Sequence, residues 1–561
     1  MFKTLTAAFS AALLSVSALA QDNGSNDIDE PRVYESRGQV TVNDQRIRYS
    51  VTAGETFLRN SDGEATASIF STAYIADNLG DPRTRPIAFV FNGGPGSASL
   101  WLHMGVFGPQ RLALPNAEDD GAAPYDMVEN VYSILDVADL VFVDPVGTGW
   151  SRPLGDHEGS EFWGVNEDAE SLATFIRMWL SDNQRWNSPK YLLGESYGTL
   201  RIGALLNQLE GSYTDVAING VALISTVLDF RFDDTSQGND IGYVGLMPGF
   251  AATAWYHNKV DRSAWNGDIV AFLADARTFA IEEYMPALMY GVTLPDERRA
   301  RVVSELSRYV GLMPGFAATA WYHNKVDRSA WNDDIEAFLD DARTFAIEEY
   351  MPALMYGVTL PDERRARVTS ELSRFIGLSE SFLERANMRV SLRRFQRELR
   401  RDEGLSVGRL DSRFTGVEVD GVGENPETDP SFYGIDGSFT ATMLDYFTRT
   451  LGVDISEYYS TIGGVRGWNW DVGSSGNNNY INVAPWIARA MRQNSDLEVL
   501  VAQGYYDLAT PFFSAELMFN QPGFDQDRVT FTYYEAGHMM YIHEPSLVTF
   551  TQDVRELITG E

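Results

Sequence analysis

The chain has 561 residues, of which 79 are acidic and 44 are basic, giving a formal net charge of −35, and it contains no cysteine. So acidic a surface repels nucleic acid and anionic lipid, and the lack of cysteine excludes disulfides and thiolate metal sites. The length exceeds that of a usual single core, so we expect a core with an inserted domain. No histidine cluster suggests a metal site, and we expect neither a metal nor a cofactor.

The first 20 residues are typical of a secretory signal peptide. Lys3 precedes an apolar stretch that runs through Leu14, and A-L-A at Ala18–Ala20 precedes Gln21. The apolar stretch is too short and too interrupted for a membrane anchor, and no later stretch reaches spanning length. We therefore expect a secreted or periplasmic protein without membrane insertion, and export without disulfides suits a bacterial periplasm or the outside medium.

Two early regions have the patterns of strands. Residues 33–72 alternate in polarity around a turn at Asn43-Asp44, which predicts an antiparallel edge to a mostly parallel sheet. A further strand-like run ends at Phe89–Phe91, and N-G-G-P-G-S follows at Asn92–Ser97. Backbone amides of paired glycines after an early strand are the usual second half of an oxyanion hole. A simple Gly-Pro turn is the alternative.

A second glycine-rich loop follows the strand-like run Leu140–Val143. It reads D-P-V-G-T-G-W-S-R, Asp144–Arg152, and resembles a phosphate-binding loop in its glycine content. It lacks the G-x-x-x-x-G-K-[ST] spacing, and no lysine is near. The sequence therefore does not predict nucleotide binding.

The stretch Leu192–Gly198 reads L-L-G-E-S-Y-G and is the most informative in the chain. A short apolar run that leads into G-x-S-x-G is the signature of a nucleophile elbow, a tight strand-to-helix turn that exposes a serine hydroxyl. The two glycines leave room in the turn, and apolar residues at helical spacing follow. We predict Ser196 as the nucleophile and the Tyr197 amide as one oxyanion donor. An ordinary β-turn-α junction is the alternative.

The middle of the chain contains a repeat. Tyr243–Arg308 is followed immediately by Tyr309–Arg374, a nearly identical copy offset by 66 residues. The copies differ at four pairs of positions: Gly267 and Asp333, Val270 and Glu336, Ala274 and Asp340, Val303 and Thr369. A solenoid needs about three or more units, so we interpret the repeat as a tandem duplication, either real or an error in the sequence. Its apolar spacing is helical, and the acids of the second copy predict a more solvated first helix.

An activated serine needs a base, and the base needs an acid that orients it. In α/β-hydrolases the chain order is serine, acid, histidine. Of six histidines in the sequence, four precede the serine or lie in the repeat: His103, His157, His257 and His323. His538 follows a strand-like run, Val529–Tyr534, and lies in E-A-G-H. His543, beside Glu544, is more simply a surface histidine. We therefore predict His538 as the base.

The acid is predicted by the same logic. Leu497–Ala502 (L-E-V-L-V-A) has the pattern of a strand, and Asp507 lies in the loop that follows it. A loop aspartate is usually a turn or cap residue, and spacing alone does not exclude other acids. Its place between Ser196 and His538 in the chain favours Asp507 as the residue that orients the base.

Together these motifs resemble the serine carboxypeptidase family, peptidase family S10. The matching segments are N-G-G-P-G at Asn92–Gly96, D-P-V-G-T-G-W-S at Asp144–Ser151, G-E-S-Y-G at Gly194–Gly198 and the segments around Asp507 and His538. The resemblance covers most of the chain outside the repeat. The glutamate directly before the nucleophile makes it more specific than a bare esterase motif.

The resemblance implies three groups of site residues. The catalytic triad would be Ser196, Asp507 and His538. The donors of the oxyanion hole would be the amides of Gly94 and Tyr197. The side chains that hold the terminal carboxylate of a substrate would be Asn92 and Glu195.

Two positions depart from the family pattern. Eukaryotic members have a second glutamate that pairs with the one before the serine, and counting without gaps from Asn92 to Gly108 places Val106 there. Ser97 stands where the family motif has a cysteine. Because two carboxyls in contact raise the pKa of one of them and so bind a carboxylate at acid pH, Val106 leaves open both strict exopeptidase specificity and an acid optimum.

The sequence therefore predicts an α/β-hydrolase fold, a mostly parallel central sheet flanked by helices, with an inserted helical cap. The expected divisions are a signal peptide at 1–20, the first part of the core at 21–235, the cap at 236–430 with the copies 243–308 and 309–374, and the second part of the core at 431–561.

The predicted function is that of a secreted serine carboxypeptidase-like hydrolase. It would release C-terminal residues from peptides through an acyl-enzyme on Ser196, without a cofactor, and its partners would be peptide substrates. The sequence does not indicate an oligomeric state. Two alternatives remain open: an esterase or acyltransferase on the same triad, and a catalytically inactive binding protein whose site the cap occludes.

Overall fold

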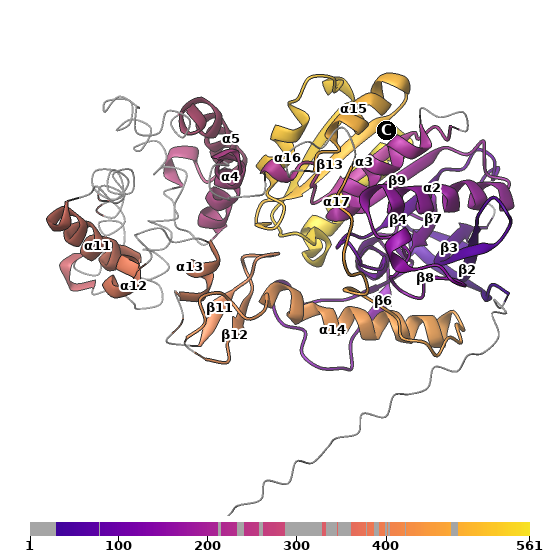
Figure 1. Cartoon of the computed structure of the whole chain (residues 1–561), viewed down its shortest axis with the longest axis horizontal. Helices are drawn as coiled ribbons and strands as arrows, with labels where there is room; N and C mark the ends of the chain where they lie inside the picture. Colours follow the sequence, from indigo (N-terminus) through magenta and orange to yellow (C-terminus); the bar gives the residue numbers. More distant parts are fainter. Residues whose placement is uncertain are drawn as a thin grey trace, which may run out of the picture.

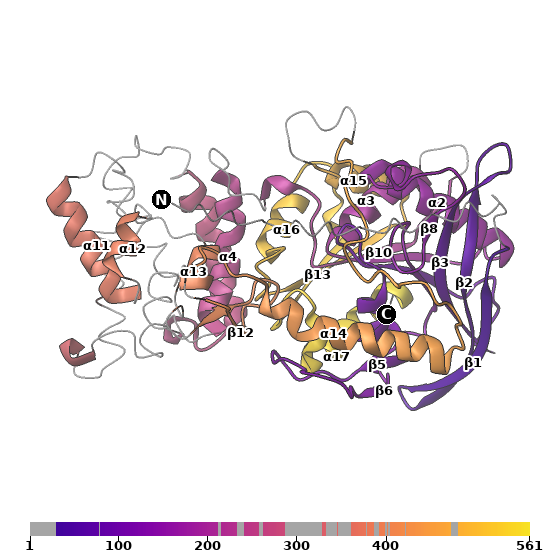
Figure 2. The same cartoon turned by 60° about the horizontal axis from the view of Figure 1, so that its bottom comes forward.

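The computed structural model describes residues 30–77, 79–210, 215–232, 240–256, 262–286, 328–331, 341, 345, 361–376, 379–385, 392–398, 401, 404–420, 422–472 and 481–560. The predicted signal peptide and most of the second repeat copy, Tyr309–Arg374, lie outside these residues. Figures 1 and 2 show the described part of the chain as a sheet with helices on both faces and a group of helices set to one side.

The described residues form a ten-stranded sheet with the order β1-β2-β3-β7-β4-β9-β10-β13-β14, and β8 pairs with β3. The strands of this sheet are β1 (Val33–Val42), β2 (Gln45–Arg59), β3 (Ala65–Ala76), β4 (Ile87–Phe91), β7 (Asp139–Val143), β8 (Arg152–Pro153), β9 (Lys190–Glu195), β10 (Gly220–Ile224), β13 (Glu498–Gly504) and β14 (Val529–Tyr534). Two small sheets pair β5 (Gln110–Leu112) with β6 (Met127–Glu129), and β11 (Leu405–Val407) with β12 (Thr415–Val417).

The pairing divides the large sheet into an antiparallel edge and a parallel centre. Strands β1, β2, β3 and β7 pair antiparallel in that order, and every pair from β7 through β14 is parallel. The predicted turn joins β1 to β2, with Asn43 at φ 49° and Asp44 at φ 60°, as a hairpin that follows the twist of its strands requires. Strand β4 reads I-A-F-V-F and is buried throughout, because both of its faces are covered.

Helices cover both faces of this sheet. One face packs on α2 (Val165–Asp182), α3 (Tyr197–Leu209), α15 (Ala484–Gln493) and α16 (Phe512–Phe519). The other packs on α1 (Leu100–Leu102), α14 (Pro430–Asp445) and α17 (Glu544–Thr559). This arrangement is the α/β-hydrolase fold predicted from the sequence. Short turns of other helix types are η1 (His103–Phe107), η2 (Gly159–Glu161), η3 (Phe230–Phe232), η4 (Ser263–Trp265), η5 (Ala280–Tyr284), η7 (Arg328–Trp331), η11 (Tyr446–Thr450), η13 (Gln526–Arg528) and η14 (Met540–Ile542).

The inserted region between β10 and β13 is mostly helical where it is described, and it also contains the β11–β12 hairpin. It contains α4 (Asp240–Tyr256), α5 (Ile269–Phe279), α11 (Asp362–Ile376), α12 (Glu380–Arg385) and α13 (Leu392–Glu398). Helices α4 and α5 lie beside α16, whereas α11 and α12 lie at the end of the molecule farthest from the sheet (Figures 1 and 2). Residues of α4 and α5 share a buried apolar cluster with Tyr505, Tyr506 and Phe512. Helices α4 and α5, in the described part of the first repeat copy, therefore pack on the loop that carries Asp507.

Three of the four positions at which the repeat copies differ lie on the surface in the first copy. Gly267, Val270 and Ala274 are all exposed there, and Val270 is 58% exposed. Acidic residues at the equivalent positions of the second copy therefore replace groups that face solvent in the first. Within the described ranges, no helix is both long and apolar enough to cross a membrane.

Candidate active site

Ser196 occupies a tight turn between β9 and α3. Its backbone has φ 60° and ψ −127°, a conformation that costs a non-glycine residue about 1–3 kcal/mol. A Cβ on Gly194 would lie 2.5 Å from the carbonyl oxygen of Gly198, and a Cβ on Gly198 would lie 2.9 Å from that of Phe91. Both glycines of G-x-S-x-G are therefore required by close backbone contacts, as a nucleophile elbow demands.

The hydroxyl of Ser196 is accessible and available. The residue is only partly buried, and its amide donates a hydrogen bond of 2.9 Å to the carbonyl of Ile224. Among the described residues its side chain has no hydrogen-bond partner, so the hydroxyl is free to turn toward a base. The elbow thus presents the predicted nucleophile at the end of the central strand β9.

The loop that follows β4 lies directly against the elbow. A Cβ on Gly93 would lie 2.6 Å from the amide nitrogen of Tyr197 and 2.9 Å from Cβ of Ser196. Gly94 has φ 106°, which glycine adopts without strain. Within the described part of the chain neither the Gly94 nor the Tyr197 amide donates a hydrogen bond, so both are available to an oxyanion beside the serine.

Asp507 and His538 form a buried pair at the ends of β13 and β14. Nδ1 of His538 lies 2.7 Å from Oδ2 of Asp507, and the carboxylate is fully buried. Burial lowers the pKa of His538, but the charge and hydrogen bond of Asp507 outweigh it, so the pKa lies above its usual 6.5. The carboxylate thus fixes the ring and stabilises its charged form, which is what a catalytic base requires.

Thr510, which was not predicted from the sequence, completes this pair. Its hydroxyl donates to Oδ2 of Asp507 at 2.6 Å and lies 3.1 Å from Nδ1 of His538. The amides of Ala509 and Thr510 donate to Oδ1 at 2.8 and 3.0 Å. The short segment D-L-A-T therefore immobilises its own aspartate. An aspartate followed three residues later by threonine was the available signal, because both types bond to nearby backbone in turns.

Backbone contacts bring the serine and the histidine to the same edge of the sheet. The Ser196 amide bonds to the last residue of β10, Ile224, and the hydroxyl of the next residue, Ser225, donates to the carbonyl of His538 at 2.6 Å. The His538 amide in turn donates to the carbonyl of Leu410 at 2.9 Å. The three predicted triad residues therefore lie at the carboxyl ends of β9, β13 and β14, which is where sites form in parallel sheets.

Glu195 and Asn92 form a second polar group next to the serine. Nδ2 of Asn92 donates to Oε1 of Glu195 at 3.2 Å, and the amide of Leu102 fixes Asn92 by donating to Oδ1 at 3.0 Å. The hydroxyl of Tyr541 donates to Oε2 of Glu195 at 2.6 Å. Burial raises the pKa of Glu195 to about 7, against the opposing effects of His538 and Tyr541. Well below pH 7 this side chain is therefore mostly a neutral acid able to donate a hydrogen bond.

The residue in contact with Glu195 is not the one at which the family resemblance placed a second glutamate. Val106 is fully buried in the apolar cluster on the α17 face of the sheet. Tyr541, from η14, contacts Glu195 instead, and the neighbouring Gly105 lies against the tyrosine ring. No sequence pattern predicts this contact, because 346 positions separate its two partners.

The loop at Asp144–Ser151 has a structural part in this site. Oδ1 of Asp144 accepts the amide of Ser99 at 2.8 Å, and Oδ2 accepts the hydroxyl of Tyr459 at 3.0 Å. Burial raises the pKa of Asp144 to about 6. Asp144 therefore connects its own loop to the start of α1, which follows the Gly93–Gly94 loop, and to the segment that contains Tyr459.

The serine carboxypeptidase family model matches residues 57–267 of the chain. The match contains the Gly93–Gly94 loop, the Asp144 loop and the elbow around Ser196. Over these residues the chain is similar to the serine carboxypeptidase family. The matched region ends before Asp507 and His538, so the roles of those two residues rest on their geometry.

Several known proteins are similar to this chain over part or most of its length. Serine carboxypeptidase-like 10 from Arabidopsis thaliana is 28% identical over 146 residues, 25% of this chain and 31% of that protein. Serine carboxypeptidase ctsa-3.1 from Caenorhabditis elegans is 24% identical over 197 residues, 34% of this chain and 31% of that protein. Among solved structures, KEX1(DELTA)P, a prohormone-processing carboxypeptidase from Saccharomyces cerevisiae, aligns over 91% of both chains with 13% identity and a TM-score of 0.45. The match to these curated serine carboxypeptidases spans about a third of their length.

Proposed function

We propose that the chain is a serine carboxypeptidase-like hydrolase that releases C-terminal residues from peptides through an acyl-enzyme on Ser196. The observation that carries this proposal is the buried Asp507–His538 pair, at 2.7 Å, on the same sheet edge as the strained Ser196 elbow. Such a pair supplies what general-base catalysis by histidine needs, because the carboxylate holds the ring in place and stabilises its charged form while the ring takes a proton from the nucleophile and returns it.

The proposed reaction begins with attack by the Ser196 hydroxyl on the carbonyl carbon of the last peptide bond. His538 accepts the hydroxyl proton at Nε2 while Asp507 holds Nδ1–H and stabilises the imidazolium. The amides of Gly94 and Tyr197 stabilise the oxyanion, and loss of one such donor typically costs on the order of a hundred- to a thousandfold in rate. His538 then gives its proton to the leaving amine, and a water repeats the sequence on the acyl-enzyme.

The specificity for a free C-terminus is proposed to come from Asn92 and Glu195. Neutral Glu195 donates a hydrogen bond to the substrate carboxylate, and Nδ2 of Asn92 supplies a further donor. An ionised Glu195 would instead repel that carboxylate. The proposal therefore requires the raised pKa of Glu195, about 7, for binding near neutral pH.

An esterase or acyltransferase on the same triad is the second candidate. It is favoured by Val106, which is buried in apolar surroundings where the family resemblance places a second carboxyl. Recognition of a carboxylate would then rest on Glu195 with Asn92 only. An inactive binding protein is disfavoured by the Asp507–His538 pair and the accessible Ser196 hydroxyl.

A pair of blocked dipeptides tests the function, one with a free C-terminal carboxylate and one with the same sequence as a C-terminal amide. The proposal predicts release of the last residue, with kcat/KM higher by roughly tenfold or more for the free acid. Equal rates for the two peptides, or cleavage of esters alone, would contradict the carboxypeptidase assignment. Transfer of the acyl group to an added alcohol or amine in preference to water would identify an acyltransferase.

We further propose that the protein is secreted or periplasmic after removal of residues 1–20. The support is the sequence pattern from Lys3 to Ala20 alone. Amino-terminal sequencing of the protein from its native source should start at Gln21, and a mature protein that still begins at Met1 would contradict export by this route.

A further inference from the structure

The carboxyl of Glu195 has one hydrogen-bond donor on each oxygen, and the two donors differ in strength. Asn92 donates to Oε1 at 3.2 Å, whereas Tyr541 donates to Oε2 at 2.6 Å. Tyr541 is only 3% exposed, so its hydroxyl is largely removed from solvent. The shorter contact therefore dominates the orientation of the Glu195 side chain.

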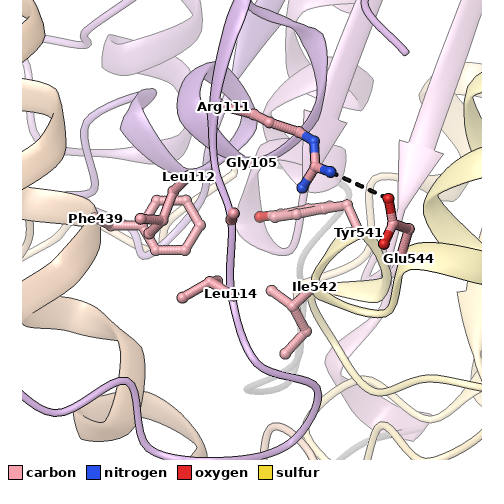
Figure 3. A pocket seen from close by; sticks show the side chains of 9 residues that line it. Gly105, Arg111, Leu112, Leu114, Phe439, Tyr541, Ile542 and Glu544 are labelled. Carbon is pink, nitrogen blue, oxygen red and sulfur yellow. Dashed lines mark hydrogen bonds and ion pairs between the residues drawn. The ribbon is translucent and has the colours of Figure 1, made fainter. Parts of the chain in front are cut away.

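Tyr541 reaches Glu195 because Gly105 makes room for its ring. A Cβ on Gly105 would lie 2.4 Å from Cε2 and 2.6 Å from Cδ2 of Tyr541. Figure 3 shows the tyrosine side chain extended toward Gly105, with the Arg111–Glu544 ion pair beside it and Leu114 and Ile542 below. Gly105 immediately precedes Val106, the position at which the family resemblance places a second carboxyl, so the Tyr541 ring packs against the neighbour of that position in the chain.

A phenol is a different partner from a carboxyl. Burial and the neighbouring Glu195 raise the pKa of Tyr541 well above 10, so it stays a donor throughout the working range of an enzyme. Two carboxyls share a proton and titrate as a pair, but with Tyr541 as partner Glu195 titrates without a second acid in contact. Tyr541 and Asn92 bond to Glu195 as neutral groups, and the titratable groups whose charges act on it are His538 and Asp507.

We propose that Tyr541 is a positioning residue that orients Glu195 toward the C-terminal carboxylate of the substrate and sets the pH range in which that carboxylate is bound. This inference rests on the proposed carboxypeptidase function and names the residue that replaces the second carboxyl. Tyr541 acts through Glu195 and does not touch the reacting atoms.

The test is Tyr541→Phe, which removes only the hydroxyl. The matched control is Tyr534→Phe, because Tyr534 is equally buried at 3% exposure and its hydroxyl donates to Oδ2 of Asp553 at 2.5 Å, a similar pair away from the site. KM and kcat are measured from pH 5 to 8.5 for the free-acid and amidated dipeptides and for a blocked amino-acid ester.

Tyr541→Phe should raise KM for the free acid roughly fivefold to tenfold at pH 6, with kcat for the ester changed less than about twofold. The Tyr541 hydrogen bond lowers the pKa of Glu195, so its loss should move the alkaline limb of the free-acid profile upward by roughly one pH unit. A role in folding alone would not move that limb. Gly105→Ala displaces the ring and should reproduce both effects without altering the hydroxyl.

The outcomes separate this inference from the function on which it rests. A wild-type enzyme that prefers the free acid, with Tyr541→Phe indistinguishable from Tyr534→Phe at every pH, overturns the role of Tyr541 and leaves the carboxypeptidase intact. A wild-type enzyme that does not discriminate between acid and amide overturns the proposed function, and the inference with it. An unchanged alkaline limb in Tyr541→Phe also overturns the role of Tyr541, even where KM rises.

Discussion

Glu195→Gln is expected to stabilise the fold at neutral pH. Burial raises the pKa of Glu195 from 4.5 to about 7, so the folded protein keeps a proton there at pH values at which the unfolded chain has lost it. The stability contributed by the neutral carboxyl is therefore fully present below about pH 4.5 and is lost as the pH rises to about 7. A glutamine does not titrate, and its amide suits the site because the Tyr541 hydroxyl also accepts hydrogen bonds.

The size of the effect follows from the two pKa values. The difference between 4.5 and about 7 corresponds to about 3 kcal/mol once Glu195 is ionised in both states. Thermal unfolding of the wild type and Glu195→Gln, followed at pH 5 and pH 8, provides the assay. The melting temperature of the variant should exceed that of the wild type by several degrees at pH 8 and by little at pH 5.

Glu55→Gln is the control for the removal of one negative charge from a very acidic chain. The carboxylate of Glu55 pairs with Arg32 at 2.8 Å. Although burial opposes it, the pairing with Arg32 and Arg152 lowers the pKa of Glu55 to about 2. Its contribution to stability is present at both pH values, so its loss should lower the melting temperature at both. An equal rise in melting temperature for Glu195→Gln at pH 5 and pH 8, or a similar rise for Glu55→Gln, would refute the reasoning.

Three further predictions concern the catalytic pair, the pH profile and the repeat. Asp507→Asn places an amide nitrogen opposite Nδ1 of His538, which moves the ring proton to Nε2. We therefore expect kcat to fall roughly ten-thousandfold, while the circular dichroism spectrum stays unchanged. Retention of a tenth of the rate would exclude the orienting role. Free-acid peptides should show a bell-shaped kcat/KM profile near neutral pH, limited by protonation of His538 on the acid side and by ionisation of Glu195 near pH 7 on the other, whereas esters should show the acid limb alone. Deletion of Tyr309–Arg374 should leave the core folded and keep or raise activity toward small substrates; a lower melting temperature or lost activity would show that both copies are integrated.

The parts of the fold and site that could be predicted are those whose signals are local in the sequence. The elbow around Ser196 is a strand, a tight glycine turn and a helix in succession, and Asp507 and His538 each follow their own strand. The Asn43-Asp44 turn is likewise encoded where it occurs. Parallel strands then bring these separate loop ends to one edge without further information.

The contacts that could not be predicted depend on packing between distant segments. Tyr541 meets Glu195 only because Gly105 leaves space for its ring, and counting along the sequence from Asn92 pointed to Val106 instead. Packing of the first repeat copy on Tyr505 and Phe512 is similarly a property of the folded core. In each case the apolar or small character of a residue was visible in the sequence, but its neighbour was not.

The central claim is that His538 activates Ser196 as a nucleophile, and reaction with a fluorophosphonate probe followed by peptide mass spectrometry tests it most directly. The account predicts one adduct, on Ser196, at a rate that falls as His538 is protonated and that is abolished in Ser196→Ala and strongly reduced in His538→Ala. The double variant should lose little more turnover than either single variant, because the residues act as a unit. An unlabelled Ser196, or substantial peptide turnover by Ser196→Ala, would contradict the account.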